Sequence, residues 1–149
     1  MKIENNILLE ISDADAVDGV ITIPDYVTEL ADNTCNKLSY PVIGNGIVKA
    51  GNYCIRGNKA EMSFPALETI GNWCICWNEV DMSFPALKTV GNICICYNKA
   101  SITFPNLQIV GNGCICYNKS DMSFPALKMV GYLCILDNEA QIKKSLLKR

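Results

Sequence analysis

The chain has 149 residues, of which 50% are hydrophobic and 19% are charged, and its formal net charge is -2. This length favours one domain with a continuous core, and the small net charge creates no whole-chain field that would attract nucleic acid or a membrane surface. The charges are unevenly distributed, because residues 1–34 carry eight acids against one lysine, whereas residues 35–149 carry twelve bases against seven acids. We therefore expect an acidic N-terminal cap and a basic C-terminal end.

The N-terminal segment MKIENNILLE lacks the basic region, the apolar stretch and the cleavage site of a secretory signal. No apolar run in the sequence approaches the length of a membrane span. The nine cysteines recur largely at a fixed period, which favours free thiols in a reducing compartment over a disulfide framework. We therefore expect a cytoplasmic protein that does not associate with membranes.

A 20-residue unit then repeats without insertion, as in GNWCICWNEVDMSFPALKTV followed by GNICICYNKASITFPNLQIV. A strict period of this length indicates stacked units that bury their apolar side chains against their neighbours. We expect one solenoid domain over residues 1–149. Its parts are an acidic cap with one degenerate repeat at 1–34, an irregular repeat at 35–50, five coils at 51–140 and a basic cap or tail at 141–149.

Within each unit the segment D-M-S-F-P alternates apolar and polar residues and ends at proline, which has no N–H for a β-ladder. This pattern predicts one short strand per coil in a parallel β-sheet, with the methionines and phenylalanines inside and Ser63, Ser83, Thr103 and Ser123 outside. The inward phenylalanines are Phe64, Phe84, Phe104 and Phe124. After the proline, the apolar spacing predicts an irregular or 3₁₀ segment on the opposite side of the coil.

The unit I-x-F-P-x-L-x-x-V-G-x-x-C-I-x-x-N resembles the Treponema-type, or BspA-like, leucine-rich repeat over about residues 7–140. Cys94, Ile95 and Asn98 fall where that family places alanine, phenylalanine, and cysteine or asparagine. The units here are shorter than the usual units of the family, so a tighter coil is expected. The resemblance implies a leucine-rich-repeat-type solenoid and, because many members are cell-surface or effector-like binding proteins, a binding role without a particular partner.

A cysteine ladder runs through the repeats at one position per coil, and three further cysteines follow it two residues later at Cys76, Cys96 and Cys116. The ladder consists of Cys54, Cys74, Cys94, Cys114 and Cys134. Two C-x-C pairs on neighbouring coils would offer four thiolates to zinc. The spacing is not C-x2-C, however, and the chain contains no histidine, so packed free thiols are favoured and we predict neither a metal nor a cofactor.

Catalysis is not expected, because cysteine or serine attack lacks a histidine base. The acids Asp81 and Asp121 occupy equivalent, solvent-facing positions of their coils and indicate a solvated surface rather than a carboxylate pair. A second ladder consists of Asn58, Asn78, Asn98, Asn118 and Asn138. It predicts a structural role in which each side chain caps backbone groups at a coil corner.

Aromatic residues occupy one coil position, counted from the turn glycine as position seven, at Trp77, Tyr97 and Tyr117, with Trp73 nearby at position three. Other coils place glycine or aspartate at position seven, so the rings are expected to be partly exposed. They either cover the core or form an apolar stripe that binds a partner. The rival binding surface is the outer sheet face, which includes Asp81 and Asp121.

The leading hypothesis is a non-catalytic protein-binding scaffold, such as an inhibitor or an effector, whose partner is another protein. The alternative is a structural solenoid that self-assembles or forms a homodimer. The last unit carries Lys143 and Lys144 where a further strand would pair, which disfavours growth from that end. Nucleic-acid binding through Lys88, Lys99, Lys119 and Lys128 is a weaker hypothesis, because acids occupy the same positions in other coils.

Overall fold

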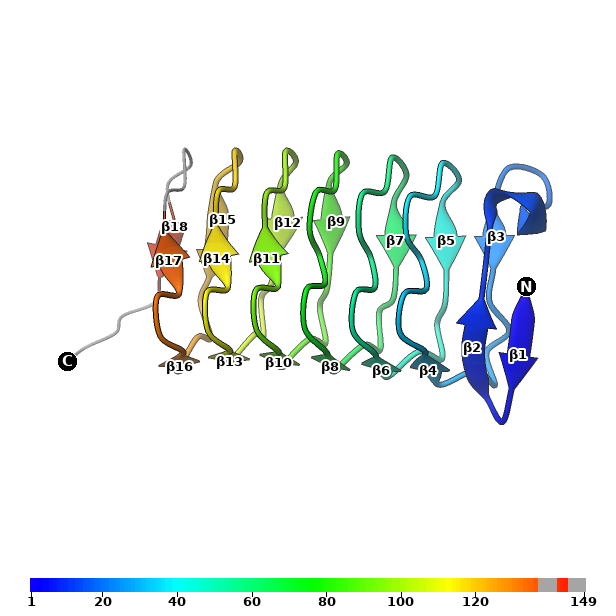
Figure 1. Cartoon of the computed structure of the whole chain (residues 1–149), viewed down its shortest axis with the longest axis horizontal. Helices are drawn as coiled ribbons and strands as arrows, with labels where there is room; N and C mark the ends of the chain where they lie inside the picture. Colours follow the sequence, from blue (N-terminus) through cyan, green and yellow to red (C-terminus); the bar gives the residue numbers. More distant parts are fainter. Residues whose placement is uncertain (137–141, 145–149) are drawn as a thin grey trace.

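The computed structural model describes residues 1–134 and the backbone of 135–136 and 142–144. Successive coils lie side by side along the long axis of the molecule and form a parallel β-solenoid, so the predicted repeat solenoid is confirmed (Figure 1). From Lys49 onward, paired residues of neighbouring coils are 20 apart, as in Lys49 and Thr69 or Thr89 and Ile109. The sequence period is therefore the length of one turn of the solenoid.

The largest sheet contains eight strands and runs along one side of the solenoid. Its members pair in parallel except for the first, which pairs antiparallel with the second. In order these strands are β1 (Lys2–Glu4), β2 (Ile7–Glu10), β4 (Glu29–Leu30), β6 (Lys49–Ala50), β8 (Thr69–Ile70), β10 (Thr89–Val90), β13 (Ile109–Val110) and β16 (Met129–Val130).

A second side of each coil is formed by the predicted M-S segment. The strands β3 (Ile21–Thr22), β5 (Val42–Ile43) and β7 (Met62–Ser63) form one sheet. Further along the axis, β9 (Met82–Ser83) pairs with β12 (Ile102–Thr103), and β15 (Met122–Phe124) pairs with β18 (Ile142–Lys144). The first residue of β3, β5, β7, β9, β12 and β15, a methionine, isoleucine or valine, points into the core, because side chains alternate across a strand.

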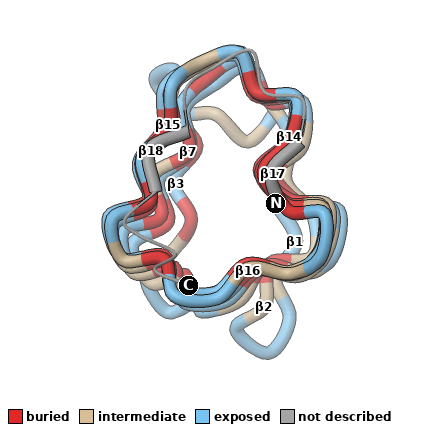
Figure 2. The backbone as a smooth tube through the Cα atoms, turned by 90° about the vertical axis from the view of Figure 1, so that its left-hand side faces the viewer, coloured by how far each residue is buried: buried red, intermediate tan, exposed pale blue. Residues whose placement is uncertain are grey.

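The third side is where the structure departs from the predicted single strand per coil. Here β11 (Ile95–Cys96), β14 (Ile115–Cys116) and β17 (Ile135–Leu136) form a sheet. Isolated parallel bridges extend this line back through Cys76, Arg56 and Asn36. Viewed along the axis, each coil is a closed loop with strands on three sides (Figure 2). The correct description is therefore up to three short strands per coil.

The predicted 3₁₀ segments are absent from the described coils, and the single 3₁₀ helix of the described residues is η1 (Asp13–Asp15) near the N-terminus. Two physical reasons explain this result. The segment after each proline is rich in β-branched residues, which favour extended backbone. The turn glycines also stack closely, since a Cβ on Gly71 would lie 2.9 Å from the carbonyl carbon of Gly51.

Left-handed backbone forms the corners of the coils. At position three, Tyr53 and Trp73 have φ values of 58° and 57°, and at position seven Trp77 has a φ of 56°. Gly57 and Gly113 occupy the same two positions in other coils, with φ values of 63° and 61°. Glycine is therefore accepted there because it adopts this conformation without strain, and not only because the position is exposed.

The core contains a stack of phenylalanines, one from each of four successive coils. Phe64, Phe84, Phe104 and Phe124 are each 0% exposed. The ring centroids of Phe84 and Phe104 are 5.9 Å apart, and those of Phe104 and Phe124 are 5.4 Å apart. The rings fill the interior at the spacing that the parallel strands impose, which is roughly 4.8 Å per coil.

The N-terminal end differs from the regular coils. The antiparallel β1–β2 hairpin forms the N-terminal edge of the large sheet (Figure 1). The Met1 amino group contacts the carboxylate of Asp15 in η1. Residues 31–50 pair in register with 51–70 and form a full 20-residue coil, so the boundary expected at residue 35 lies inside a coil. Within residues 1–136 and 142–144, no helix is long and apolar enough to cross a membrane.

Candidate functional site

Trp77, Tyr97 and Tyr117 form a stack on one corner of the solenoid, which we call the aromatic column. The ring centroids of Trp77 and Tyr97 are 5.1 Å apart with an interplanar angle of 4°, and those of Tyr97 and Tyr117 are 4.8 Å apart at 8°. The three residues are 39%, 39% and 43% exposed. The rings therefore cover one another with their faces and present their edges to solvent.

The backbone fixes the position of each ring. The N–H of Trp77 donates to the carbonyl of Cys96 at 3.2 Å, and the N–H of Tyr97 donates to the carbonyl of Cys116 at 3.0 Å. All three residues have left-handed backbone, with φ between 55° and 60°. The backbone of the column is held by the same ladder that holds the coils together, and each ring stacks on its neighbours, so little side-chain freedom remains to be lost on binding.

Trp73 lies beside the start of the column, and its ring centroid is 6.4 Å from that of Trp77 with an interplanar angle of 3°. It is partly buried, whereas the column residues are exposed. The position-six cysteines form a small apolar cluster with Ile93, separate from the main core. This cluster consists of Cys76, Cys96 and Cys116.

Sequence reasoning missed two residues of this site, Arg56 and Tyr53. The guanidinium carbon of Arg56 lies 4.8 Å from the ring centroid of Trp77 and 5.4 Å from that of Tyr53. Both distances are typical of cation–π contacts. A signal was present in the sequence, because position six holds arginine in this coil and cysteine in the next three. The arginine thus extends the column by one coil toward the N-terminus.

A pocket of about 390 Å³ opens at this N-terminal end of the aromatic column. It is lined by Asn36, Lys37, Arg56, Gly57 and Trp77. The pocket exists because position seven of this coil is Gly57, which has no side chain to stack on the ring of Trp77. A cationic guanidinium, an ammonium group and an indole therefore line one small cavity.

The cysteine ladder lies inside the solenoid, and all nine cysteines are free and buried. The thiol of Cys94 donates to the carbonyl of Gly71 at 2.8 Å, and the thiol of Cys114 donates to that of Gly91 at the same distance. Burial raises the pKa of the Cys35 thiol to about 12, since the apolar core disfavours the thiolate. Across the described residues, no three cysteine or carboxylate side chains form a group that would hold a metal ion.

Buried asparagines connect each coil to the next. Asn58, Asn78, Asn98 and Asn118 are 0% exposed, and Asn138 lies outside the described residues. The Asn98 side chain accepts the N–H of Asn78 at 3.1 Å and donates to the carbonyl of Ile75 at 2.7 Å. Each buried amide therefore forms hydrogen bonds with backbone groups of a preceding coil. Without these bonds, burial of the backbone groups would destabilise the fold.

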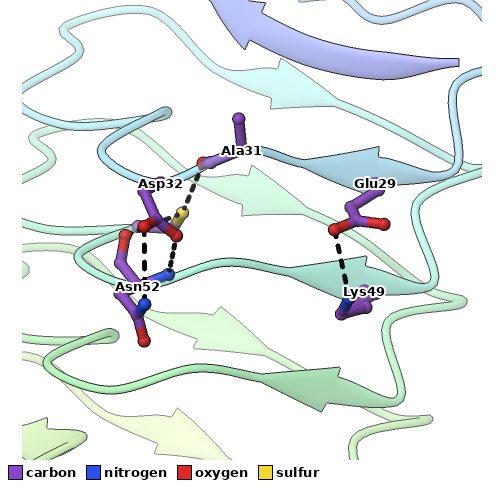
Figure 3. Close-up of polar contacts among 6 residues, drawn as sticks. Glu29, Ala31, Asp32, Lys49 and Asn52 are labelled. Atoms are coloured by element: carbon purple, nitrogen blue, oxygen red, sulfur yellow. Dashed lines mark hydrogen bonds and ion pairs between the residues drawn. The ribbon is translucent and has the colours of Figure 1, made fainter. Parts of the chain in front are cut away.

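A more exposed ladder begins with aspartate instead of asparagine. Asp32 accepts the backbone N–H of Asn52 at 2.7 Å (Figure 3). Asn52 in turn accepts the N–H of Asn72 at 2.8 Å. In the same region Lys49 pairs with Glu29 at 3.2 Å (Figure 3). The Cys54 thiol donates to the Ala31 carbonyl at 3.1 Å. These contacts join one coil to the next.

The rival surface is polar and lies on the M-S side of the coils. Asp81 is exposed and accepts the N–H of Ser101 at 2.8 Å, while the Thr103 hydroxyl donates to Ser83 at 2.9 Å. Asp121 is exposed at the equivalent position of a later coil. The structure thus brings Trp73 and the aromatic column together in one site and leaves Asp81 and Asp121 on another surface.

The geometry defines the chain as a parallel β-solenoid with an exposed aromatic column. Comparison of the chain with protein-family models, with curated proteins and with solved structures finds no match in any of the three. Functional assignment therefore depends on the chemistry of the surface itself.

Proposed function

We propose that the protein is a non-catalytic repeat scaffold that binds another protein through the aromatic column. The observation that supports this proposal is the stack of Trp77, Tyr97 and Tyr117, each about 40% exposed, in which Trp77 and Tyr97 are also held by backbone hydrogen bonds. Tyrosine and tryptophan are enriched among the residues that contribute most to protein interfaces. Rings that are already ordered lose little entropy when a partner covers them.

A protein partner fits this surface better than a nucleic acid. Bases bind to aromatic side chains by stacking on ring faces, but the faces of the central ring, Tyr97, are covered by its neighbours. Two of the lysines on the coils are paired with acids, since Lys88 and Lys99 each lie 3.0 Å from a glutamate of the preceding coil. These pairs leave less positive charge for phosphate groups.

The second candidate is self-association, in which the aromatic column of one copy packs on that of another. A stripe that runs along the axis is able to meet its own copy across a two-fold axis, which is the usual symmetry of a homodimer. Growth from the ends is a weaker form of this candidate, because the N-terminal edge strand, β1, runs antiparallel to the strands of the coils and the last described strand, β18, contains Lys143 and Lys144.

We further propose that the protein acts in the cytoplasm, as an inhibitor or effector without a metal or cofactor. Nine buried free thiols support a reducing compartment. The resemblance of the repeat unit to BspA-like leucine-rich repeats supports a binding role in general.

The test compares two multiple variants. Trp77→Ser/Tyr97→Ser/Tyr117→Ser removes the column, and Asp81→Lys/Asp121→Lys reverses the charge of the rival surface. Proteins captured by the wild-type chain from the lysate of its native host are identified, purified and titrated against each variant by calorimetry. We expect the triple variant to weaken binding about 100-fold or more and the lysine variant to leave it unchanged, with native melting transitions for both.

The opposite result would move the binding site to the M-S side of the coils. Self-association is measured on the same samples by sedimentation equilibrium. A dimer that disappears in the triple variant, together with no purified protein that binds, would replace the partner by a second copy of this chain.

A further inference from the structure

We propose that the pocket at the N-terminal end of the aromatic column is a subsite for a carboxylate, supplied by an aspartate or glutamate side chain of the partner protein. This inference rests on the proposed function and names the chemistry of one contact within it. The pocket lies where the column stops, so a partner that covers Trp77 also reaches Arg56 and Lys37.

Arg56 supplies donors that the chain itself does not use. Its Nε atom is buried and has no hydrogen-bond partner. Among residues 1–136, no carboxylate forms an ion pair with Arg56 or with Lys37. The contacts of Arg56 with Tyr53 and Trp77 satisfy its charge in part but occupy none of its five N–H groups. Nε is enclosed and out of reach of a ligand, so the four N–H groups of the two terminal guanidinium nitrogens are the donors available in the pocket.

Three other lysines of the coils form ion pairs with acids of the same chain. Lys49, Lys88 and Lys99 each pair with a glutamate of the preceding coil, at 3.2, 3.0 and 3.0 Å. The pocket instead places two cations, from Arg56 and Lys37, beside each other without an acid. Charge complementarity therefore favours an acidic group of the partner at this point of the surface.

The walls of the pocket are already fixed. The Asn36 side chain accepts the N–H of Arg56 at 3.1 Å and donates to the carbonyl of Tyr53 at 2.6 Å. Gly57 has no side chain, so the space beside Arg56 and Trp77 is left unfilled. A planar group is thus able to enter beside the indole while the guanidinium donates to its edge.

A carboxylate suits these donors better than a phosphate. Phosphate sites commonly use several backbone N–H groups, but the nearest ones here are engaged, since Lys37 and Gly57 donate to the carbonyls of Arg56 and Cys76. The side chain of Asn36 is engaged as well. The remaining donors belong to one guanidinium and one ammonium, and the guanidinium fork matches the two oxygens of a carboxylate.

The test uses sodium benzoate as the probe and the full chain as the protein. The indole N–H signal of Trp77, assigned with a Trp73→Phe variant, is followed by NMR during titration at constant ionic strength. Benzyl alcohol is the neutral control for the ring of the probe. We expect a saturable shift with benzoate and none with benzyl alcohol at the same concentration.

Two variants make the assignment specific. Arg56→Gln removes the charge and most of the donors, and it should weaken benzoate binding about tenfold or more. Lys88→Gln, which removes a paired lysine elsewhere on the coils, should leave it unchanged. Thermal melts check that both variants fold. Equal responses to benzoate and benzyl alcohol, or equal affinity of Arg56→Gln and the wild type, would overturn the proposal.

Two further binding measurements use phenyl phosphate and the purified partner as ligands. Tighter binding of phenyl phosphate than of benzoate by about tenfold or more would also overturn the proposal, in favour of a phosphorylated group. For the partner, Arg56→Gln should lower affinity about tenfold. If benzoate does not bind and Arg56→Gln leaves the affinity for the partner unchanged, the carboxylate subsite is refuted, while the aromatic column can still be the binding surface. If benzoate binds but the triple serine variant binds the partner as tightly as the wild type, the proposed function is refuted, while the pocket is still a carboxylate site.

Discussion

Two stacks of aromatic rings run along the solenoid, one inside and one outside. In the core, the centroids of Phe104 and Phe124 are 5.4 Å apart, and in the aromatic column those of Tyr97 and Tyr117 are 4.8 Å apart. The inner rings are 0% exposed, whereas the outer ones are about 40% exposed. The repeat therefore stacks rings both in the core and on the surface, and the stacking alone does not reveal the role of a residue.

The difference lies in what each position requires. The inner position is phenylalanine in four successive coils, because the surrounding coils leave one volume to fill. Position seven holds Lys37, Gly57, Trp77, Tyr97 and Tyr117 in successive coils, and all five have positive φ. The fold constrains the backbone there and leaves the side chain free. The fold therefore does not require aromatic residues at position seven.

The largest expected effect is on the inner stack. Phe104→Ala should lower the free energy of unfolding by about 3–5 kcal/mol, because the ring is fully buried between Phe84 and Phe124 and its removal leaves a cavity. Urea denaturation followed by circular dichroism measures this change. The control is Tyr97→Ala, which should cost less than half as much. Equal losses for the two variants would contradict the division into an inner and an outer stack.

The next effect concerns the buried asparagines that hold the coils around the inner stack. Asn98→Ala should cost about 2–3 kcal/mol, since it leaves the N–H of Asn78 and the carbonyl of Ile75 without this partner in the core. Asn92→Ala in the same coil is the matched control. Asn92 is exposed and accepts one N–H, from Asn112, so its loss should cost under about 1 kcal/mol. Similar losses of unfolding free energy in Asn98→Ala and Asn92→Ala would show that burial does not determine how much each asparagine stabilises the fold.

The buried thiols of the core make the free energy of unfolding depend on pH, whereas the rings of the outer stack do not. The pKa of Cys35 is raised to about 12 by burial, while an unfolded thiol has a pKa of about 8.5. The unfolded state releases this proton first, so the stabilisation is fully present below about pH 8.5 and is lost as the pH rises toward 12. Cys35 should contribute a fall of about 1.4 kcal/mol per pH unit over that window.

The measurement is urea denaturation in reductant at pH 8, 9 and 10. Cys35→Ala should lower the slope of the pH dependence by this amount and leave the contribution of the other thiols with a raised pKa, such as Cys74 and Cys94, whereas Tyr97→Ala should not change the slope. A slope that is the same in Cys35→Ala and in the wild type would contradict the raised pKa.

The smallest expected effect is the sharpest test of the outer stack. Tyr97 has a φ of 60°, which an L-residue adopts at a cost of about 1–2 kcal/mol and glycine adopts freely. Tyr97→Gly should therefore be about 1 kcal/mol more stable than Tyr97→Ala, although glycine removes more atoms. At the inner position the order should reverse, with Phe104→Gly less stable than Phe104→Ala. Thermal unfolding of the four variants compares them, and the same order at both positions would refute the backbone constraint.

The solenoid and its inner stack are predictable from the sequence because both depend on local rules. A strict period of 20 predicts stacked coils, and the alternation in M-S-F predicts that Met82 and Phe84 point to the same side. Both residues are in the core. The prediction depends on hydrophobicity and strand geometry, which a single repeat already contains.

The third strand and the pocket are not predictable in this way. The i, i+3, i+7 spacing after the proline suits a helical arc, but such spacing also arises when a chain turns two corners in a closed coil. Ile75 has left-handed backbone, whereas Ile95 pairs as a strand in the equivalent position. Arg56 contacts a ring that lies 21 residues later, Trp77, and the pocket depends on the missing side chain of Gly57 between them. Such contacts depend on the register between coils.

The buried asparagines give the solenoid a mechanical polarity. Asn98 receives the N–H of Asn78 and donates to Ile75, so the hydrogen bonds of one coil are completed by a residue of the next. Under tension applied at the C-terminal end, the outermost coil must detach before the one behind it is released. Each detached coil of 20 residues lengthens the chain by roughly 70 Å at about 3.4 Å per residue. In an optical trap, the repeat period would be recorded as the step length of extension.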